Sequence, residues 1–218
     1  MYDLLIDLDN TIYPEDSEIF SQIDTKMKEF ISKYLNISPD EAYKLQKKYF
    51  YENGTTLRGL MLNHNVKPES FLEYVHAINV KNIKKNSKLK IALNQYKGKK
   101  IIFTNGTKKH ALNILQSVGV EKCIDYIFDI KNMEYIPKPN IFAYKKVLKK
   151  YALSPENTIL FDDISNNLKP AYEMKIKTVL IKKIIDRRYN KDYINYIISD
   201  LTEALTKLTN KEIFNGNK

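Results

Sequence analysis

Short apolar runs and helical repeats follow one another along the chain. Mainly apolar runs, which are typical of buried strands, occur at residues 4–6, 101–103, 126–128, 158–161 and 177–181. Apolar residues at helical spacing lie between these runs, at residues 87–97, 108–118, 140–151 and from after Asp163 to about Met174. Strands that alternate with helices predict a parallel, doubly wound α/β sheet.

The segment between the first two apolar runs has a different character. Residues 15–85 contain no convincing strand, and a capping box at Ser38 and Glu41 marks the start of one of their helices. Helical spacing recurs four times in this segment, at residues 17–35, 39–51, 55–64 and 68–76. We therefore expect an all-helical cap at residues 15–85, inserted after the first strand into a core of residues 1–14 and 86–218.

The last part of the chain is polar. Beyond Lys182 the clearest apolar pattern is a helical repeat at Leu201, Leu205 and Leu208. The length of 218 residues suits one large domain or a domain with an insertion. With 43% hydrophobic residues, including 16 Tyr and 9 Phe, the chain can bury a substantial core.

The net charge of +10 comes from 36 Lys and Arg residues against 26 Asp and Glu residues. A basic balance can indicate nucleic acid, a membrane surface or anionic substrates as partners. Here the basic residues are dispersed, with no pure Lys/Arg run longer than a pair, and the chain is also rich in Asn, Ile and Tyr, which have A/T-rich codons. Base composition therefore explains much of the lysine, and we expect no nucleic-acid partner.

Cysteine content and hydropathy bear on the cellular setting. Cys123 is the only cysteine, so the chain can form neither an intramolecular disulfide nor a cysteine zinc site. The N-terminus has no basic region followed by an apolar stretch, and no run of 18 apolar residues occurs. We therefore expect a cytoplasmic protein with no membrane partner, as a monomer or a homodimer.

Two carboxylates, Asp7 and Asp9, follow the first apolar run. On a strand, residues two apart point to the same side, so both can project from its carboxyl end, where open α/β sheets bind ligands. Close carboxylates repel each other unless a cation or a shared proton relieves them. The pair is thus a candidate metal or acid/base site, and the alternative is an ordinary Asp-Asn turn after a strand.

Polar groups also follow two later strands. Thr104 and Asn105 follow one apolar run, Asp162 and Asp163 follow another, and Lys138 lies between two prolines in a loop. Because the ends of parallel strands meet at one edge of a sheet, these groups converge on the first pair. A nucleophilic carboxylate, a second acid, a hydroxyl, a lysine and ligands for Mg²⁺ are the groups that phosphoryl transfer requires.

The chain resembles the haloacid dehalogenase superfamily over nearly its whole length. The four motifs of that superfamily match, in order, Asp7-x-Asp9-x-Thr11, Thr104, Lys138 and Asp162-Asp163. The resemblance implies a Rossmann-like parallel sheet with a helical cap between the first and second motifs. It also implies phosphatase rather than dehalogenase activity, because dehalogenases of the superfamily lack the second acid, here Asp9.

The resemblance implies a role for each matching residue. Asp7 corresponds to the nucleophile that forms an aspartyl-phosphate, and Asp9 corresponds to the general acid/base. Thr104 and Lys138 match the positions that stabilise the phosphate.

The implied cofactor is Mg²⁺. Its ligands correspond to Asp163, with Asp162, alongside Asp7 and the backbone carbonyl of Asp9. Asn167 falls where the fourth motif often carries a last polar residue.

A finer resemblance is to the pyrimidine 5′-nucleotidase branch. It rests on less diagnostic strings: Asp-Asn-Thr-Ile-Tyr-Pro at 9–14, Gly-Thr-Thr-Leu-Arg-Gly-Leu at 54–60, Phe-Thr-Asn-Gly at 103–106 and Pro-Lys-Pro at 137–139. We accordingly expect substrate contacts from five residues, Leu8, Asn105, Gly106, Arg58 and Thr56. Arg58 can also be an ordinary helix-surface residue, and we interpret His64, His76 and His110 as structural or surface residues.

We therefore predict a Mg²⁺-dependent phosphomonoester hydrolase that uses an aspartyl-phosphate intermediate. The expected substrate is a small phosphomonoester, a pyrimidine nucleoside 5′-monophosphate in the first instance. Two alternatives stay open: a sugar- or cofactor-phosphate phosphatase of the same superfamily, and a non-catalytic module that binds a phosphate ligand.

Overall fold

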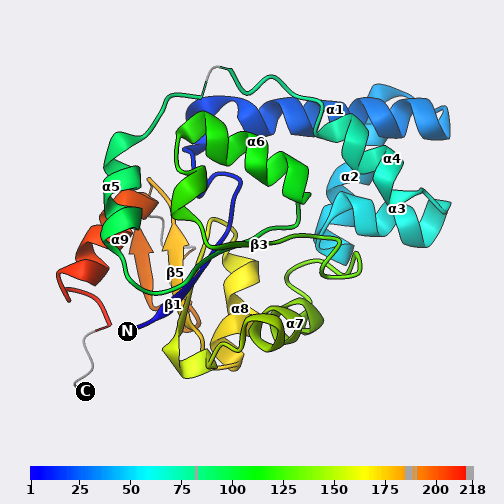
Figure 1. Ribbon diagram of the computed structural model, residues 1–218. Helices are drawn as coiled ribbons and strands as arrows, with labels where there is room; N and C mark the ends of the chain where they lie inside the picture. The colour runs from blue at the N-terminus through cyan, green and yellow to red at the C-terminus, as the bar shows by residue number, and fades with distance from the viewer. Residues whose placement is uncertain (82, 185–188, 190, 215–218) are drawn as a thin grey trace.

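The computed structural model describes residues 1–81, 83–184, 189 and 191–214 of the chain. A six-stranded, all-parallel sheet in the order β3-β2-β1-β4-β5-β6 forms its centre (Figure 1). The strands are β1 (Asp3–Ile6), β2 (Lys100–Phe103), β3 (Tyr126–Phe128), β4 (Thr158–Asp162), β5 (Lys177–Ile181) and β6 (Tyr196–Ile198). The expected α/β core is confirmed, and β1 lies at its centre between β2 and β4.

Alternate residues of the strands face two separate layers of helices. Leu4 and Ile6 of β1 are buried in the core on one face, whereas Leu5 is buried in the core on the other, as the period of two along a strand requires. The first face is covered by α5 (Ser87–Gln95), α6 (Lys108–Val118) and α9 (Leu201–Thr209), and the second by α7 (Ile141–Tyr151) and α8 (Ser165–Glu173). The sheet is thus doubly wound.

A helical cap is inserted after β1. A short 3₁₀ turn (Glu15–Ser17) leads into α1 (Ile19–Leu35), α2 (Pro39–Asn53), α3 (Thr56–His64) and α4 (Pro68–Val75). The capping box predicted at Ser38 and Glu41 begins α2. At Gly59, a Cβ atom would lie 2.3 Å from the Tyr49 ring, so glycine is what lets α3 pack closely on α2.

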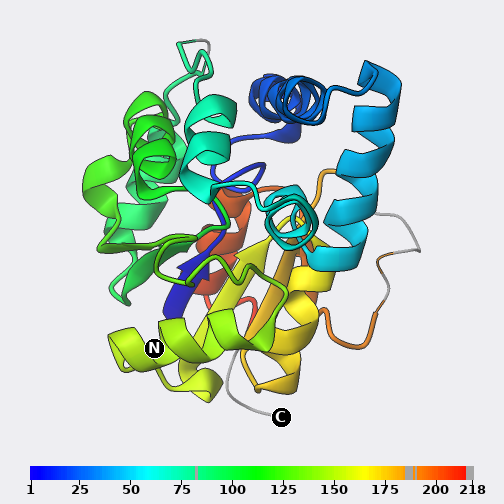
Figure 2. The ribbon, with the colours of Figure 1, turned by 90° about the vertical axis from the view of Figure 1, so that its right-hand side faces the viewer.

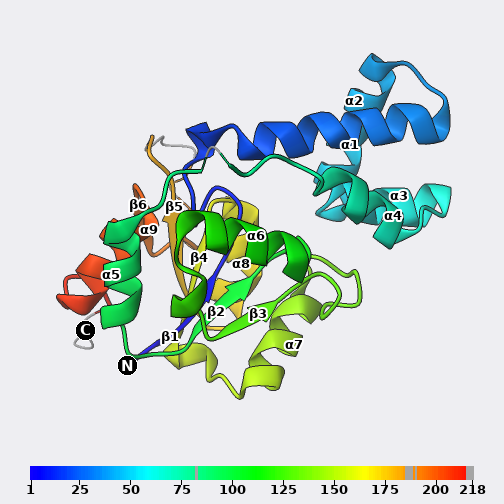
Figure 3. The same cartoon turned by 45° about the horizontal axis from the view of Figure 1, so that its top comes forward.

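The cap helices pack on one another above the sheet. Helix α1 contacts α2 and α4, and α2 contacts α3. Figures 2 and 3 show these helices grouped beyond the end of the sheet toward which β1 runs. The cap therefore covers the edge at which the strands end, where the sequence places its polar groups.

Helix α5 follows the cap in the chain and contacts α9 in the core. The two helices lie side by side, far from α2 and α3, in Figures 1 and 3. We therefore propose that the cap spans residues 15–85, as the sequence pattern suggests.

The polar C-terminal region holds the main difference from the sequence-based expectation. Five strands were expected, but Tyr196–Ile198 adds a sixth, β6, which pairs in parallel with β5. Residues 185–188, 190 and 215–218 of this region lie outside the described residues. Among the helices that the structure does describe, none is long and apolar enough to cross a membrane.

Candidate active site

Three carboxylates meet at the carboxyl end of the sheet. Asp7 follows β1, Asp162 ends β4 and Asp163 follows it, so two adjacent strands supply the whole cluster. Each residue offers a carboxylate oxygen, and these oxygens lie within 4.8 Å of one another. The sequence-based expectation that these groups converge is therefore correct.

Lys138 supplies a positive charge to this cluster. Its Nζ donates to Asp7 Oδ1 at 2.8 Å and to Asp162 Oδ2 at 2.7 Å, and the side chain is only 1% exposed. Burial acts to lower the pKa of Lys138, but the charges of Asp162 and Asp7 outweigh it and raise the pKa above its usual value. The lysine is thus a fixed cation beside Asp7.

Asn105 holds the Lys138 loop in place. Its Oδ1 accepts from the Lys138 backbone N–H at 2.9 Å, and its Nδ2 donates to the Lys138 carbonyl at 3.1 Å. Both groups of the amide are used in this way, so the side chain positions the lysine. Asn105 also lines the cavity described below, so the substrate contact that the sequence suggests stays a prediction.

Three carboxylates against one buried ammonium leave excess negative charge. Burial, and the neighbouring charges of Asp162 and Asp163, raise the pKa of Asp7 well above its usual value despite Lys138. Burial and the Asp162 charge raise the pKa of Asp163 to about 7. A cation relieves this repulsion, and an all-oxygen donor set suits a hard ion such as Mg²⁺.

Asp162 and Asp163 differ in their free oxygens. Asp162 accepts hydrogen bonds from the backbone N–H of Ile164, from Asn167 Nδ2 and from Lys138 Nζ at 2.7–3.1 Å. For Asp163 the contacts are longer, 3.4 Å from Asn10 Nδ2 and 3.9 Å from Lys182 Nζ, both at Oδ2. Asp163 therefore has more capacity for an ion, while Asp162 and Asn167 act together to hold Lys138.

The Asp9 side chain points to a different group of partners. Its Oδ1 accepts from the Tyr13 hydroxyl at 2.7 Å and pairs with His110 Nε2 at 2.9 Å, and its carboxylate is not in the metal cluster. The resemblance assigns only its backbone carbonyl to the metal. Burial acts to raise the pKa of Asp9, but attraction to His110 and the hydrogen bonds from His110 and Tyr13 lower it overall.

A second histidine supports the first. His76, at the end of cap helix α4, stacks on His110 of α6 with ring centroids 4.3 Å apart and an interplanar angle of 6°. His76 Nδ1 also lies 3.2 Å from the Thr107 hydroxyl. Burial and the neighbouring His110 lower the pKa of His76 to about 3, so this ring is neutral near neutral pH. The stack joins the cap to the partner of Asp9.

Thr104 lies at the end of β2 beside these groups. It is almost fully buried, and its Oγ1 accepts from the Gly106 backbone N–H at 2.9 Å. The hydroxyl proton remains available for a phosphoryl oxygen, as the expected role requires. On the other side, Thr11 Oγ1 donates to Asp7 Oδ2 at 3.3 Å, so the loop that follows β1 also holds the Asp7 carboxylate.

A cavity of about 400 Å³ separates this edge of the sheet from the cap. Its lower wall includes Asp7, Asp9, Thr104, Gly106 and Asp163. Its upper wall consists of cap residues and is rich in apolar side chains, among them Phe20, Ile23, Met27, Phe50, Phe71, Leu72 and Val75. The volume lies within the range of about 300–1,000 Å³ that is usual for small-molecule sites.

The residues that we expect to contact the substrate differ in whether their side chains line this cavity. Thr56 lines it, but its hydroxyl already donates to the Gln46 carbonyl at 3.1 Å. Arg58 lines an adjoining hollow of about 470 Å³ instead, which shares Asn167 with the cavity. The Leu8 side chain is fully buried in the core, so any substrate contact by Leu8 comes from its backbone.

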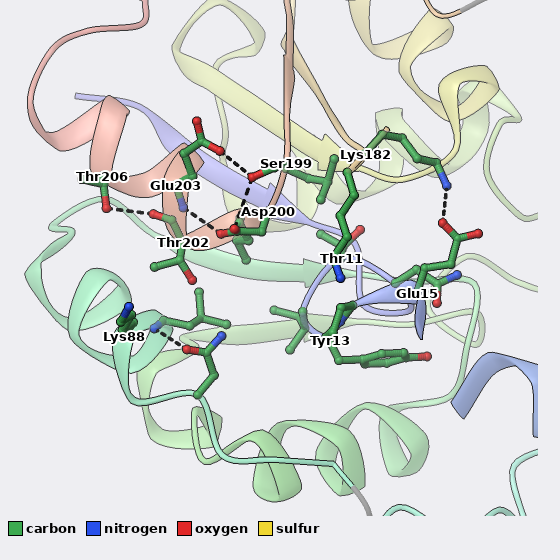
Figure 4. Close-up of a pocket in the computed structure, with 18 of the residues that line it drawn as sticks. Thr11, Tyr13, Glu15, Lys88, Lys182, Ser199, Asp200, Thr202, Glu203 and Thr206 are labelled. Atoms are coloured by element: carbon green, nitrogen blue, oxygen red, sulfur yellow. Dashed lines mark hydrogen bonds and ion pairs between the residues drawn. The ribbon is translucent and has the colours of Figure 1, made fainter. Parts of the chain in front are cut away.

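A larger hollow, of about 1,060 Å³, lies on the other side of the loop that follows β1. It is lined by Thr11 and Tyr13, Lys88 of α5, Lys182 after β5 and residues of α9 (Figure 4). Several of its charged groups form ion pairs, as in Lys182 with Glu15 at 3.1 Å. The three clustered carboxylates do not line it, so the smaller cavity is the candidate active site.

Comparison with known proteins agrees with this geometry. A model of the haloacid dehalogenase-like hydrolases matches residues 4–181, which include all four motifs. The chain belongs to this family. Although solved structures under a quarter identical show only the fold, the match to a HAD phosphatase from Thermococcus onnurineus has a TM-score of 0.63, with 21% identity over 98% of both chains.

Two curated relatives of the chain are also similar in sequence. Phosphate metabolism protein 8 of Saccharomyces cerevisiae is 27% identical over 206 residues, which are 86% of this chain and 63% of the yeast protein. The chain thus spans less than two thirds of that relative. Glyceraldehyde 3-phosphate phosphatase of Methanocaldococcus jannaschii is 26% identical over 233 residues, which are 95% of this chain and 96% of that protein.

Three residues at the site were not expected from the sequence. Tyr13 and His110 hold Asp9, and His76 supports His110, whereas the sequence alone predicts only structural or surface positions for the histidines. One signal pointed to His110: it lies in the first turn of the helix that follows Thr104, and so near the same edge of the sheet. His76 had no such signal, because its position depends on how the cap packs on the core.

Proposed function

We propose that this family member is a Mg²⁺-dependent phosphomonoester hydrolase that forms an aspartyl-phosphate on Asp7. One observation carries the proposal. Asp7, held by Lys138 and Thr11 beside two further carboxylates, lines the same cavity as a separately held acid, Asp9. A site that only bound phosphate would not require a nucleophile and a second acid together.

The first half-reaction begins with attack of an Asp7 carboxylate oxygen on phosphorus. The phosphorus–oxygen bond to the leaving group breaks, and Asp9 in its protonated form gives that oxygen its proton. Lys138, the Thr104 hydroxyl and backbone N–H groups of the strand-end loops stabilise the phosphoryl oxygens. Asp7 and Asp163 would hold Mg²⁺, and the ion would contribute further positive charge to the phosphoryl oxygens.

The second half-reaction regenerates the enzyme. Asp9, now a carboxylate, takes a proton from a water molecule that attacks the phosphorus of the aspartyl-phosphate. The bond from phosphorus to Asp7 breaks, and inorganic phosphate leaves. His110 and Tyr13 both hold Oδ1 of Asp9, and the described residues offer no hydrogen bond to Oδ2, which leaves Oδ2 for these proton transfers.

For the substrate, we propose a pyrimidine nucleoside 5′-monophosphate. The apolar, phenylalanine-rich upper wall of the cavity suits a flat base, and the core groups suit its 5′-phosphate. The resemblance of the strings at 9–14, 54–60, 103–106 and 137–139 to the pyrimidine 5′-nucleotidase branch supports the same substrate.

A triose phosphate is the second candidate substrate. The relative named glyceraldehyde 3-phosphate phosphatase aligns over 95% of this chain. A small, wholly polar leaving group would leave the apolar cap wall without a partner, so we place this candidate second.

The decisive experiment is a substrate panel with the purified chain. We expect Mg²⁺-dependent hydrolysis of a small aryl phosphate, and a higher kcat/KM for uridine or cytidine 5′-monophosphate than for glyceraldehyde 3-phosphate. Asp7→Asn should lower turnover by at least ~10³-fold, because an amide is a poor nucleophile. Near-wild-type turnover by this variant would refute the mechanism, and binding without turnover by the wild type would indicate the non-catalytic module.

We also propose Arg58 and Thr56 as substrate contacts. Arg58 can reach a nucleotide only where part of it extends into the adjoining hollow. If it does, Arg58→Ala should raise KM for the nucleotide by ~10-fold, about 1.4 kcal/mol of binding, and leave the small aryl phosphate little changed. No change with either substrate would make Arg58 a helix-surface residue.

A further inference from the structure

Gln46 occupies an unusual position in the cap. It lies on α2, in the upper wall of the reaction cavity, and only 2% of its surface is exposed. Its neighbours in this wall are mainly apolar, so the amide is a polar group in apolar surroundings. Such a group costs free energy unless both of its halves find hydrogen-bond partners.

Half of the Gln46 amide has its partner. Nε2 donates to Asp24 Oδ1 at 2.8 Å, and Lys47 Nζ donates to the same oxygen at 2.6 Å. A carboxylate with a lysine beside it can only accept, so the side of the amide that faces Asp24 is the nitrogen side. The orientation of Gln46 is therefore fixed by its neighbours.

The other half of the amide has no partner. Oε1 is closed to solvent and accepts no hydrogen bond from the described residues. A buried acceptor left in this state destabilises the fold, because it has lost water and gained no partner. Because the nitrogen side is already committed to Asp24, a ligand in the cavity can offset this cost only by bringing a donor, not an acceptor.

We infer that Gln46 selects the substrate by accepting a hydrogen bond from its leaving group. The leaving group has an N–H donor on the edge of a flat ring whose faces can stack on aromatic side chains. The ring contacts the phenylalanine-rich cap wall while its edge donates to Oε1, which becomes accessible through a small outward movement of the wall. This inference rests on the proposed nucleotide substrate and adds which group of the base is recognised.

The residues around Gln46 favour a ligand that has both a flat ring and an N–H donor. Phe20, Phe50 and Phe71 line the same cavity and offer the apolar surface on which a base can pack. A site with a buried acceptor discriminates strongly against analogues that lack the donor, because the acceptor then stays unpaired. Gln46 is thus a specificity-determining residue, separate from the groups that act on phosphate.

The test compares nucleotides with and without the donor. Two pairs are suitable: uridine 5′-monophosphate with its N3-methyl derivative, and cytidine 5′-monophosphate with its N4,N4-dimethyl derivative. For the pair whose parent is the better substrate, we expect the wild type to prefer the parent by ~10-fold or more in kcat/KM, which is about 1.4 kcal/mol. This measurement needs no variant, so it does not depend on how a substitution affects folding.

Gln46→Met then assigns that preference to the amide, because methionine has a similar length and no hydrogen-bonding carbonyl. We expect the preference for the parent nucleotide to be largely lost in this variant. Lys47→Met is the matched control, since it removes the other donor to Asp24 Oδ1 but keeps the Gln46 acceptor. It should retain the wild-type preference.

Three outcomes would overturn the inference. Equal kcat/KM for parent and methylated nucleotides in the wild type shows that the enzyme does not recognise the N–H donor. An unchanged preference in Gln46→Met shows that a residue other than Gln46 recognises it. Turnover of neither nucleotide also rejects the inference. In that case, hydrolysis of the small aryl phosphate shows that only the substrate class was wrong, and its absence shows that the proposed phosphatase function fails.

Discussion

The carboxylate of Asp9 is held on one oxygen by two side chains from different parts of the chain. Tyr13 comes from the same loop and His110 from α6, and both contact Oδ1. Such an arrangement fixes the direction of the other oxygen, which is what a proton donor to a leaving group requires. The position of Asp9, the proposed general acid, therefore depends on α6 as well as on β1.

Replacing His110 tests this dependence. We expect His110→Ala to lower kcat for a nucleotide by ~10²-fold, the lower end of what general acid–base catalysis contributes, with a smaller effect on KM. An aryl phosphate with a good leaving group needs little protonation and should be affected less.

His64→Ala is the matched control for this test, since His64 pairs with the Tyr49 hydroxyl at 2.7 Å within the cap and does not line the cavity. Equal losses on nucleotide and aryl phosphate in His110→Ala would mean that the histidine acts on something other than the leaving group.

Asp162 and Asp163 should respond differently to the same substitution. Asp163→Asn should raise the Mg²⁺ concentration for half-maximal activity by ~10-fold or more, because an amide is a weaker ligand for a hard cation. Asp162→Asn should mainly lower the melting temperature, because the carboxylate that holds Lys138, Asn167 and the Ile164 N–H is lost. Magnesium titrations and thermal melts of both variants separate these roles, and a reversed pattern would exchange the two assignments.

At the scale of helices, strands and loops, the cap approaches the core closely at Gly54. This residue ends α2 with φ +81°, and a Cβ atom there would lie 3.0 Å from the Lys138 carbonyl oxygen and from the Pro139 ring. The end of a cap helix thus rests against the loop that carries Lys138, which we propose to act on the phosphoryl oxygens.

Gly54→Ala should therefore impair catalysis as well as stability. The positive φ alone destabilises an alanine by about 1 kcal/mol. The added methyl group also meets backbone and a proline ring, which cannot rotate away, so we expect kcat/KM to fall by ~10-fold or more through displacement of Lys138.

Gly119→Ala is the matched control, because Gly119 ends α6 at φ +82° and a Cβ atom there would meet only the flexible Lys85 side chain, at 3.6 Å or more. Similar stability losses with a catalytic loss confined to Gly54→Ala would support the contact. Full activity in both variants would argue against it.

The sequence predicted the strands that carry the proposed phosphate-binding groups, because the signals for these strands lie in short stretches of the chain. Strands β1, β2 and β4 are continuous apolar runs followed at once by polar residues, and a parallel sheet brings such ends together. Strand β6 was not predicted, because Tyr196–Ile198 is a three-residue edge strand within a polar segment. Contacts such as His76 with His110 also escaped prediction, since they depend on how the cap packs on the core rather than on any local pattern.

At the scale of the whole molecule, the buried acidic cluster couples stability to pH and to metal. The pKa of Asp163 is raised to about 7 in the fold from a usual value of 3.8, and the pKa of Asp7 is also raised. At pH values between about 4 and about 7, the folded state binds more protons than the unfolded state. These groups therefore make the metal-free protein less stable as the pH rises through this range. Ionised carboxylates are also the form that binds Mg²⁺.

Magnesium should therefore raise the melting temperature more at pH 8 than at pH 5. Thermal melts with Mg²⁺ and with a chelator, at both values of pH, measure this difference. In Asp163→Asn the dependence of the Mg²⁺ effect on pH should shrink, because one of the titrating ligands is gone. A larger effect of Mg²⁺ at pH 5 would contradict the assignment of the cluster as the metal site.

The insertion of the cap between β1 and the rest of the core has a consequence for how such a protein can acquire new substrates. The side chains proposed to handle the phosphoryl group come from β1, β2, β4 and the Lys138 loop, so a cap of different shape can be exchanged as a module as long as it keeps the contacts that position these groups. Two positions limit this exchange. A grafted cap must leave room for the Lys138 loop at the place of Gly54, and it must pack on His110, which holds Asp9, at the place of His76.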